Sequence, residues 1–126
     1  MAKQKWVVGA FALLIIFSSS VMAGDDGLEG GYDKARDGYY NEAAGIFEPM
    51  ANKGSGEAQF NLGLMYHSGM GVARDEREAV KLYHKAADNG HVLAQEYLAV
   101  GYKEGWFGLE KNGGKARYWQ KRLEGK

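Results

Sequence analysis

Residues 58–69 read AQFNLGLMYHSG, and residues 94–105 read AQEYLAVGYKEG. The same residue types return after 36 positions, where Ala58, Gln59, Leu62, Tyr66 and Gly69 are matched by Ala94, Gln95, Leu98, Tyr102 and Gly105. A further copy precedes them at the same interval, with Ala43, Ala51 and Gly54 matched by Ala79, Ala87 and Gly90. Self-similarity at a fixed period of this length is typical of repeat proteins, in which each unit is one supersecondary element.

Inside each unit the apolar residues follow a helical period. One stripe has the spacing i, i+3, i+4, i+7, i+8 and consists of Ala79, Leu82, Tyr83, Ala86 and Ala87. A shorter stripe on the preceding segment consists of Ala58, Leu62, Met65 and Tyr66. No segment between residues 24 and 126 keeps the apolar–polar alternation of a strand. The sequence therefore predicts an all-α domain of about three helix hairpins, with units at about 27–54, 55–90 and 91–125.

Two residues mark the ends of the helix that carries the longer stripe. Asp75, three residues before Glu78, is a typical N-terminal cap, and Gly90 is a typical C-terminal stop. The final copy is displaced by one residue, since Ala79 matches Ala116. This displacement predicts one extra residue in the loop at 105–114.

Two residues inside predicted helices have low helix propensity. Gly63 costs about 1 kcal/mol relative to alanine, so its presence indicates that a neighbouring helix approaches closely there. Pro49 lies within the helix predicted for residues 42–53 and lacks a backbone donor. We expect it to kink that helix or to shift its start.

The first 23 residues have the three-part layout of a secretory signal. Lys3 and Lys5 precede an uncharged run at residues 6–17, and a short segment of small residues ends at Ala23. The run is too short to cross the hydrocarbon core of a bilayer, which takes about 20 apolar residues. We therefore expect cleavage near Ala23 and a helical-repeat domain at residues 24–126. The mature protein would be periplasmic or secreted, without a stable membrane anchor.

Composition excludes several classes of function. The chain has 16 Lys+Arg and 16 Asp+Glu, and this balance argues against nucleic-acid binding, which needs a clustered basic surplus. Cysteine is absent, which excludes a disulfide scaffold, a thiolate zinc site and a catalytic thiol. His67, His84 and His91 lack metal-ligand spacing, and we interpret them as surface histidines. We expect no cofactor, no metal site and no catalytic residue, and hence a protein that is not an enzyme.

Residues 57–90 resemble a complete Sel-1-like repeat, a relative of the tetratricopeptide repeats. The resemblance rests on the segment quoted above, on Gly69-Met70-Gly71-Val72, on Asp75 and Ala79, and on Ala86-Ala87 with Gly90. Residues 93–124 resemble a second copy that departs from the pattern at Gly105-Trp106-Phe107-Gly108, and residues 27–54 are similar to a tetratricopeptide hairpin. The resemblance implies a right-handed α-solenoid of stacked hairpins, and a role in holding other proteins rather than in catalysis.

In this architecture the first helix of each hairpin lines a concave surface. With Leu62 and Leu98 taken as buried, the outward positions are Glu57, Phe60, Leu64, His67, Leu93, Glu96, Val100 and Lys103. Phe60, Leu64 and Val100 are apolar where solvent would favour polar residues, so we interpret the row as a candidate partner-binding groove, with tight packing between units as the alternative. Trp106 and Phe107 are a candidate loop contact for a partner, or they close the end of their own stack.

These features together predict an exported adaptor or scaffold that binds another protein or peptide. One alternative is an immunity protein that binds a toxic effector, because some exported proteins resembling this family have that role. A second alternative is a hydrolase of β-lactams or cell-wall fragments, as suggested for cysteine-rich relatives, in which Ser55 or Ser68 would supply a hydroxyl nucleophile. A third alternative is self-assembly, in which repeat ends without polar outer faces would stack between copies.

Overall fold

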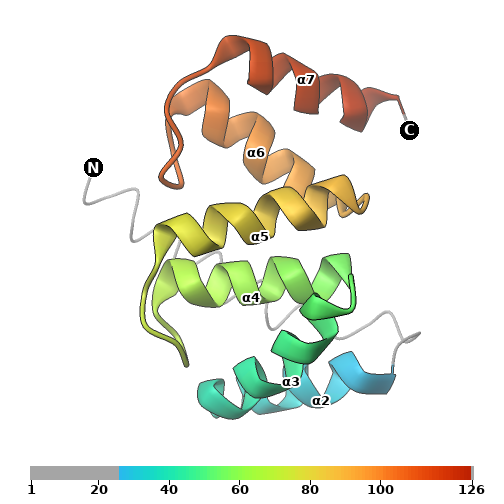
Figure 1. Ribbon diagram of the computed structural model, residues 1–126, viewed down its shortest axis with the longest axis vertical. Helices are drawn as coiled ribbons and strands as arrows, with labels where there is room; N and C mark the ends of the chain where they lie inside the picture. Colours follow the sequence, from blue (N-terminus) through green and yellow to red (C-terminus); the bar gives the residue numbers. More distant parts are fainter. Residues whose placement is uncertain (1–25, 126) are drawn as a thin grey trace.

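The computed structural model describes residues 26–125, which form six α-helices stacked as three hairpins (Figure 1). The helices are α2 (Asp26–Arg36), α3 (Tyr40–Asn52), α4 (Gly56–Ser68), α5 (Glu76–Asp88), α6 (Val92–Glu104) and α7 (Gly113–Glu124). Residues 26–125 contain no strand, and the predicted all-α repeat solenoid is confirmed. The predicted signal peptide at residues 1–23 lies outside the described residues.

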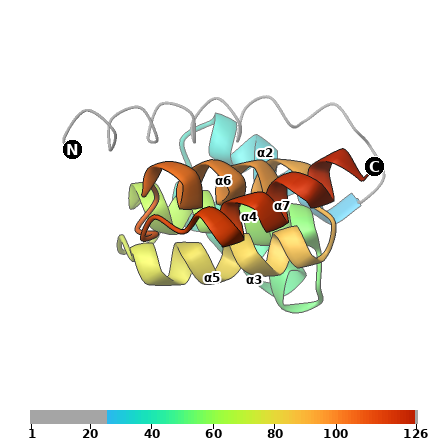
Figure 2. The same ribbon diagram turned by 90° about the horizontal axis from the view of Figure 1, so that it is seen from above.

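The hairpins share one continuous core. Seen from above, α2 and α6 lie on one side of the stack, and α3 and α5 lie on the other (Figure 2). The largest side chains that are fully buried come from all three hairpins and include Phe47, Phe60, Tyr83 and Leu98. Each hairpin therefore buries its apolar faces partly against its neighbours, as in other repeat proteins.

The predicted ends of α5 are confirmed. The Asp75 carboxylate accepts hydrogen bonds from the backbone N–H groups of Arg77 and Glu78. Gly90, just beyond α5, has a φ of 87°, a left-handed conformation that glycine adopts without steric cost. These local interactions fix where the long apolar stripe begins and ends.

Close helix approach at Gly63 is also confirmed. A Cβ atom there would lie 2.8 Å from Cε1 of Tyr83 and 3.3 Å from the carbonyl oxygen of Ala79, both on α5. The first hairpin repeats this arrangement, because a Cβ on Gly31 would lie 2.6 Å from Cε1 of Phe47. In both hairpins a glycine thus makes room for the aromatic ring of the second helix.

Pro49 leaves its helix intact. Helix α3 begins at Tyr40, ahead of the predicted start, and runs through Pro49 to Asn52. Proline has no backbone N–H to donate within the helix. Because Pro49 lies in the last turn, this loss falls at the end of the helix, with only three helical residues after it. The prediction of a helix is confirmed, and no shift of its start towards Pro49 occurs.

The repeated glutamine ties successive hairpins together. Gln59 Nε2 donates to the carbonyl oxygen of Ala51 at 3.0 Å, and Gln95 Nε2 donates to that of Ala87 at 3.0 Å. Both glutamines are buried, and each carbonyl belongs to the last turn of the preceding helix. Each carbonyl also accepts from a backbone N–H, of Gly54 or of Gly90, so the glutamine adds a second donor at a helix end. The 36-residue spacing revealed this residue pair but not its role.

Candidate functional site

The predicted groove row on α4 is buried. Phe60 is 1% exposed, Leu64 is 0% exposed and His67 is also buried, so the expectation that these three side chains face outward is wrong. Phe60 contacts Tyr83 of α5 and Tyr97 of α6, with ring centroids 5.7 Å and 5.2 Å apart. The alternative of tight packing between units is the correct one for α4.

The cause of this burial is the unit that follows α4. Tyr97 of α6 reaches back onto Phe60, and Phe107, in the loop after α6, meets the ring of His67 with centroids 5.7 Å apart. The first helix of an inner unit is therefore covered on two faces, by the preceding unit and by the following one. The prediction that took Leu62 as the buried reference accounts for the face towards the preceding unit but not for the face towards the following unit.

Glu57, the remaining predicted residue on α4, is partly buried. Its carboxylate accepts a hydrogen bond from the hydroxyl of Tyr32 on α2, and Asn61 Nδ2 donates to the same hydroxyl at 2.7 Å. Glu57 therefore joins the contact between the first and second units.

The equivalent row on α6 remains accessible. We call Leu93, Glu96, Val100 and Lys103 the α6 face. Val100 is 40% exposed, Glu96 and Lys103 are exposed, and Leu93 is half-buried. Val100 occupies the position that Leu64 has in the preceding unit, 36 residues earlier. No further unit follows α7 within residues 26–125, and so the row that is covered on α4 stays open on α6.

Phe107 is the extra residue predicted for the last loop. The loop at 105–112 is one residue longer than the loop at 69–75. Gly69 and Gly105 both have φ 74°, and Gly71 and Gly108 have φ 75° and 76°, which leaves Phe107 as the inserted position. Phe107 itself has φ 59°, an unusual conformation for a bulky residue.

The ring of Phe107 packs within its own chain. It stacks on Tyr97, with a centroid distance of 4.8 Å and an angle of 9° between the ring planes. Trp106 lies edge-on to Phe107, and both residues are half-buried. Phe107 thus packs between the second and third units. That the pair closes the open end of the stack, or serves as a contact for a partner, stays a prediction.

Both terminal helices carry polar side chains at positions where the inner helices bury apolar ones, although Tyr118 of α7 is 54% exposed. On α7, Gln120 and Glu124 occupy the positions that Tyr83 and Ala87 have on α5, and Gln120 Nε2 donates to Glu124 Oε1 at 3.1 Å. At the other end α2 carries an exposed Asp33 where α4 has the buried Met65, with Gly31 and Gly63 aligned. The terminal helices thus act as caps for the solenoid.

The interpretation of the three as surface histidines is wrong for His67, while His84 and His91 are half-buried. His67 is buried, with Nδ1 3.3 Å from the Tyr83 hydroxyl. His84 Nε2 lies 2.9 Å from the Tyr102 hydroxyl, and His91 Nδ1 accepts from the backbone N–H of Ala94 as the cap of α6. All three therefore have structural contacts, and residues 26–125 contain no cluster of His, Asp or Glu that could hold a metal ion.

Burial shifts the pKa of several groups in the core between α4, α5 and α6. It raises the pKa of Tyr97 to about 12 and that of Tyr83 well above 10. Burial also lowers the pKa of His84, while Asp88 raises it and Lys115 lowers it further. The tyrosines thus stay protonated at neutral pH and serve as packing groups rather than as bases.

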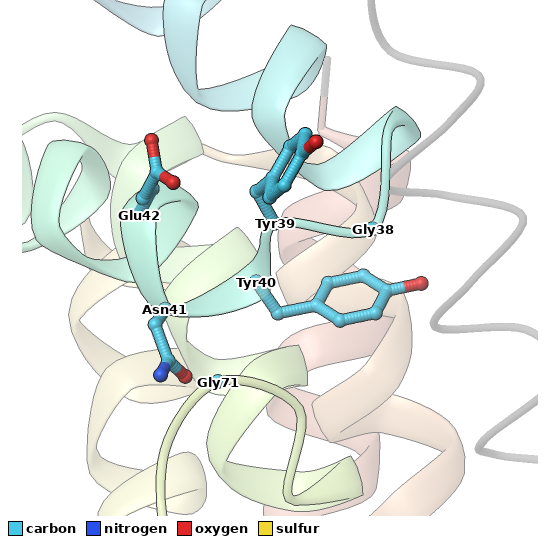
Figure 3. A pocket seen from close by; sticks show the side chains of 6 residues that line it. All are labelled: Gly38, Tyr39, Tyr40, Asn41, Glu42 and Gly71. Carbon is cyan, nitrogen blue, oxygen red and sulfur yellow. The ribbon is translucent and has the colours of Figure 1, made fainter.

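A small open hollow lies at the junction of the first two units. Figure 3 shows its lining: Gly38, Tyr39, Tyr40, Asn41, Glu42 and Gly71. The rings of Tyr39 and Tyr40 point in different directions, and Glu42 is paired with Lys34 at 2.7 Å. The lining residues therefore offer neither a stacking platform nor a pair of carboxylates for acid–base catalysis.

Comparison with known proteins identifies the repeats. The family model described as "Sel1 repeat" matches residues 56–91 and 92–122. The chain is 42% identical over 57 residues to DAP3-binding cell death enhancer 1 of Rattus norvegicus, covering 45% of this chain and 11% of that protein. It is 32% identical over 92 residues to the ERAD-associated E3 ubiquitin-protein ligase component HRD3A of Arabidopsis thaliana, covering 72% of this chain and 13% of that protein.

A solved structure resembles the whole stack. The crystal structure of a Sel1 repeat protein from Oxalobacter formigenes superposes with a TM-score of 0.59 at 26% identity, covering 93% of this chain and 80% of that chain. Within the part of the chain that the structure describes, no helix is long and apolar enough to span a membrane.

Proposed function

This chain belongs to the Sel1 repeat family, and from that premise we propose that it is an exported adaptor that binds another protein through the α6 face. Proteins of this family are generally non-catalytic modules that mediate protein–protein interactions. The HRD3A relative is itself a component of a larger ligase, by its name.

The exposure of Val100 carries this proposal. In the preceding unit the same position is occupied by Leu64, which is fully buried. The α6 face therefore repeats a row that, one unit earlier, is contacted by Tyr97 of α6 and by Phe107 of the following loop. An apolar residue at such an accessible position favours docking of a partner.

The surrounding residues indicate the kind of partner. Leu93 and Val100 supply apolar contact, and the charged Glu96 and Lys103 flank them on the same helix. An amphipathic helix with a short apolar stripe and charges of both signs would match this pattern. We propose such a helix as the bound element.

Export rests on the N-terminal signal. Fractionation of cells that express the full chain should place the protein in the periplasm or the medium, and N-terminal sequencing should begin at Gly24. A cytosolic protein that retains Met1 would contradict export without affecting the α6 face.

The binding test compares two valines on one helix. Val100→Glu places a charge in the α6 face, whereas Val92→Glu changes a valine that is 46% exposed in the first turn of α6. Affinity capture from envelope extract should lose the specific partner with Val100→Glu and retain it with Val92→Glu. Circular dichroism establishes that both variants fold. Retained capture by a folded Val100→Glu protein would refute the proposed site.

A further inference from the structure

We infer that the partner of the α6 face is a second copy of this chain, which packs antiparallel on α6 about a two-fold axis at Val100. This inference rests on the proposed function, since it names the occupant of the same face. Two-fold symmetric pairs are the commonest soluble oligomers, and their interface must be complementary to itself. The charges of the α6 face meet that requirement.

The first requirement is that opposite charges share one flank of the helix. Glu96 and Lys103 are seven residues apart, which is nearly two turns of about 3.6 residues each. They therefore project from the same side of α6. The two-fold axis is perpendicular to both helices. It places each flank of one helix against the same flank of the other helix.

The second requirement is that these charges lie at matching levels. With a rise of about 1.5 Å per residue, Glu96 is about 6 Å and Lys103 about 4.5 Å from the level of Val100, in opposite directions. In the antiparallel pair Glu96 of one copy thus comes level with Lys103 of the other, to within about 1.5 Å. The symmetry makes this pairing twice, on either side of the contact between the two Val100 side chains.

Like charges are kept apart in the same arrangement. Glu104 is eight residues from Glu96 and therefore projects from the other flank of Val100. No ion pair of Glu96 is found within residues 26–125. The Lys103 side chain is 75% exposed, and its nearest carboxylate is the adjacent Glu104 at 4.0 Å. Glu96 and Lys103 are thus available to a second copy.

Polar residues on the terminal helices favour this mode over end-to-end stacking. Gln120 and Glu124 stand on α7 where α5 has Tyr83 and Ala87, and Asp33 is exposed on α2, so an added unit would meet polar groups at these positions. Tyr118 of α7 is also exposed, but its ring lies against Arg122 of the same helix. Val100 is instead an exposed apolar side chain between two charges of opposite sign. Pairing of copies through α6 buries it and neutralises both charges.

A single cysteine tests the two-fold axis directly. The chain has no cysteine, so Val100→Cys introduces one thiol per copy, next to its symmetry mate. Mild oxidation of the purified protein should give a disulfide-linked dimer within minutes. The Val92→Cys control should remain monomeric under the same conditions. Equal crosslinking of both variants, or none with Val100→Cys, would overturn the inference.

Charge exchange provides a second test that does not depend on the cysteine. Glu96→Lys and Lys103→Glu should each raise the dimer dissociation constant by about tenfold or more, because each creates two like-charge contacts. The double variant restores opposite charges and should return the constant to within about threefold of the original value. Sedimentation equilibrium measures all four proteins. A double variant as weak as the single ones would refute the pairing of Glu96 with Lys103.

The two proposals fail in different ways. If the purified chain stays monomeric at every concentration and Val100→Glu still loses a distinct protein from envelope extract, the second copy is wrong and the adaptor site stands. If the dimer forms but tolerates Val100→Glu, the copies pair through another surface and the inference is wrong, while the capture experiment alone decides the adaptor site. Dimerisation that depends on Val100, Glu96 and Lys103 supports the inference.

Discussion

The ring of Tyr83 occupies the space where a side chain on Gly63 would be. A Cβ on Gly63 would lie 2.8 Å from Cε1 of Tyr83, a residue that is itself fully buried. In the last unit the corresponding residues are Ala99 and Gln120, so a larger residue on the first helix accompanies the loss of the aromatic ring on the second. The size of the two residues is thus matched within each hairpin.

Gly63→Ala should therefore destabilise the protein in spite of the higher helix propensity of alanine. Overpacking costs about 1–3 kcal/mol, and Tyr83 has little room to move. Gly45→Ala is the matched control, because Gly45 is also inside a helix but has nothing within 4 Å of the added Cβ. It should stabilise by about 0.5–1 kcal/mol. Urea denaturation measures both, and a Gly63→Ala protein as stable as the original would contradict the close contact.

The backbone of Phe107 predicts an unusual order of stability. Phe107→Ala loses the ring that stacks on Tyr97 but keeps a side chain at φ 59°, whereas Phe107→Gly loses the ring and relieves the strain. We expect the glycine variant to be more stable than the alanine variant by about 1 kcal/mol. Thermal denaturation gives the order directly. If the alanine variant were the more stable, the left-handed conformation would be wrong.

His84 should make the stability of the last unit depend on pH. Its pKa is lowered from 6.5 in the folded state, mainly by burial, so the unfolded chain binds a proton more readily. The neutral imidazole therefore contributes stability that is present above about pH 6.5 and declines as the pH falls below it. His84→Gln keeps a polar partner for Tyr102 and should flatten this decline. Urea denaturation at several pH values between 5 and 8 gives the free energy of unfolding of each protein. If this free energy changed with pH to the same extent in both proteins, the role of His84 would be wrong.

The positions of Leu64 and Val100 predict opposite outcomes for the same substitution. Leu64→Glu buries a charge beneath the following unit and should cost more than about 4 kcal/mol, which is enough to unfold many domains of this size. Val100→Glu changes an exposed residue and should alter stability by less than about 0.5 kcal/mol. Circular dichroism at increasing temperature distinguishes the two. Equal effects would mean that the α6 face is covered.

The periodic features of the fold could be predicted from the sequence because each depends on a few neighbouring residues. The apolar stripe of Ala79, Leu82 and Tyr83, the cap at Asp75 and the stop at Gly90 are all local. The small residue at Gly63 indicated a close approach, although not which ring makes it. The one-residue displacement placed an insertion in the last loop, but the left-handed glycines were needed to identify it as Phe107.

The candidate site was predicted less well, since exposure depends on what packs on a helix from other units. Phe60 and Leu64 look outward when Leu62 is the reference, yet Tyr97 and the following unit cover them. A signal was present in the sequence. The counterpart of Phe60 is Glu96, and that of His67 is Lys103, so these two positions are charged only where no unit follows. Comparing equivalent positions between units would have separated the buried row from the open one.

The central claim is that the α6 face is the contact surface of this protein in the cell. The most direct test places a photo-reactive amino acid at residue 100, or at residue 92 as the control, and irradiates intact cells that express the chain. We expect residue 100 to crosslink to a second copy or to another protein, and residue 92 to give little product. Crosslinks of equal yield at both positions, or none at residue 100, would contradict the account.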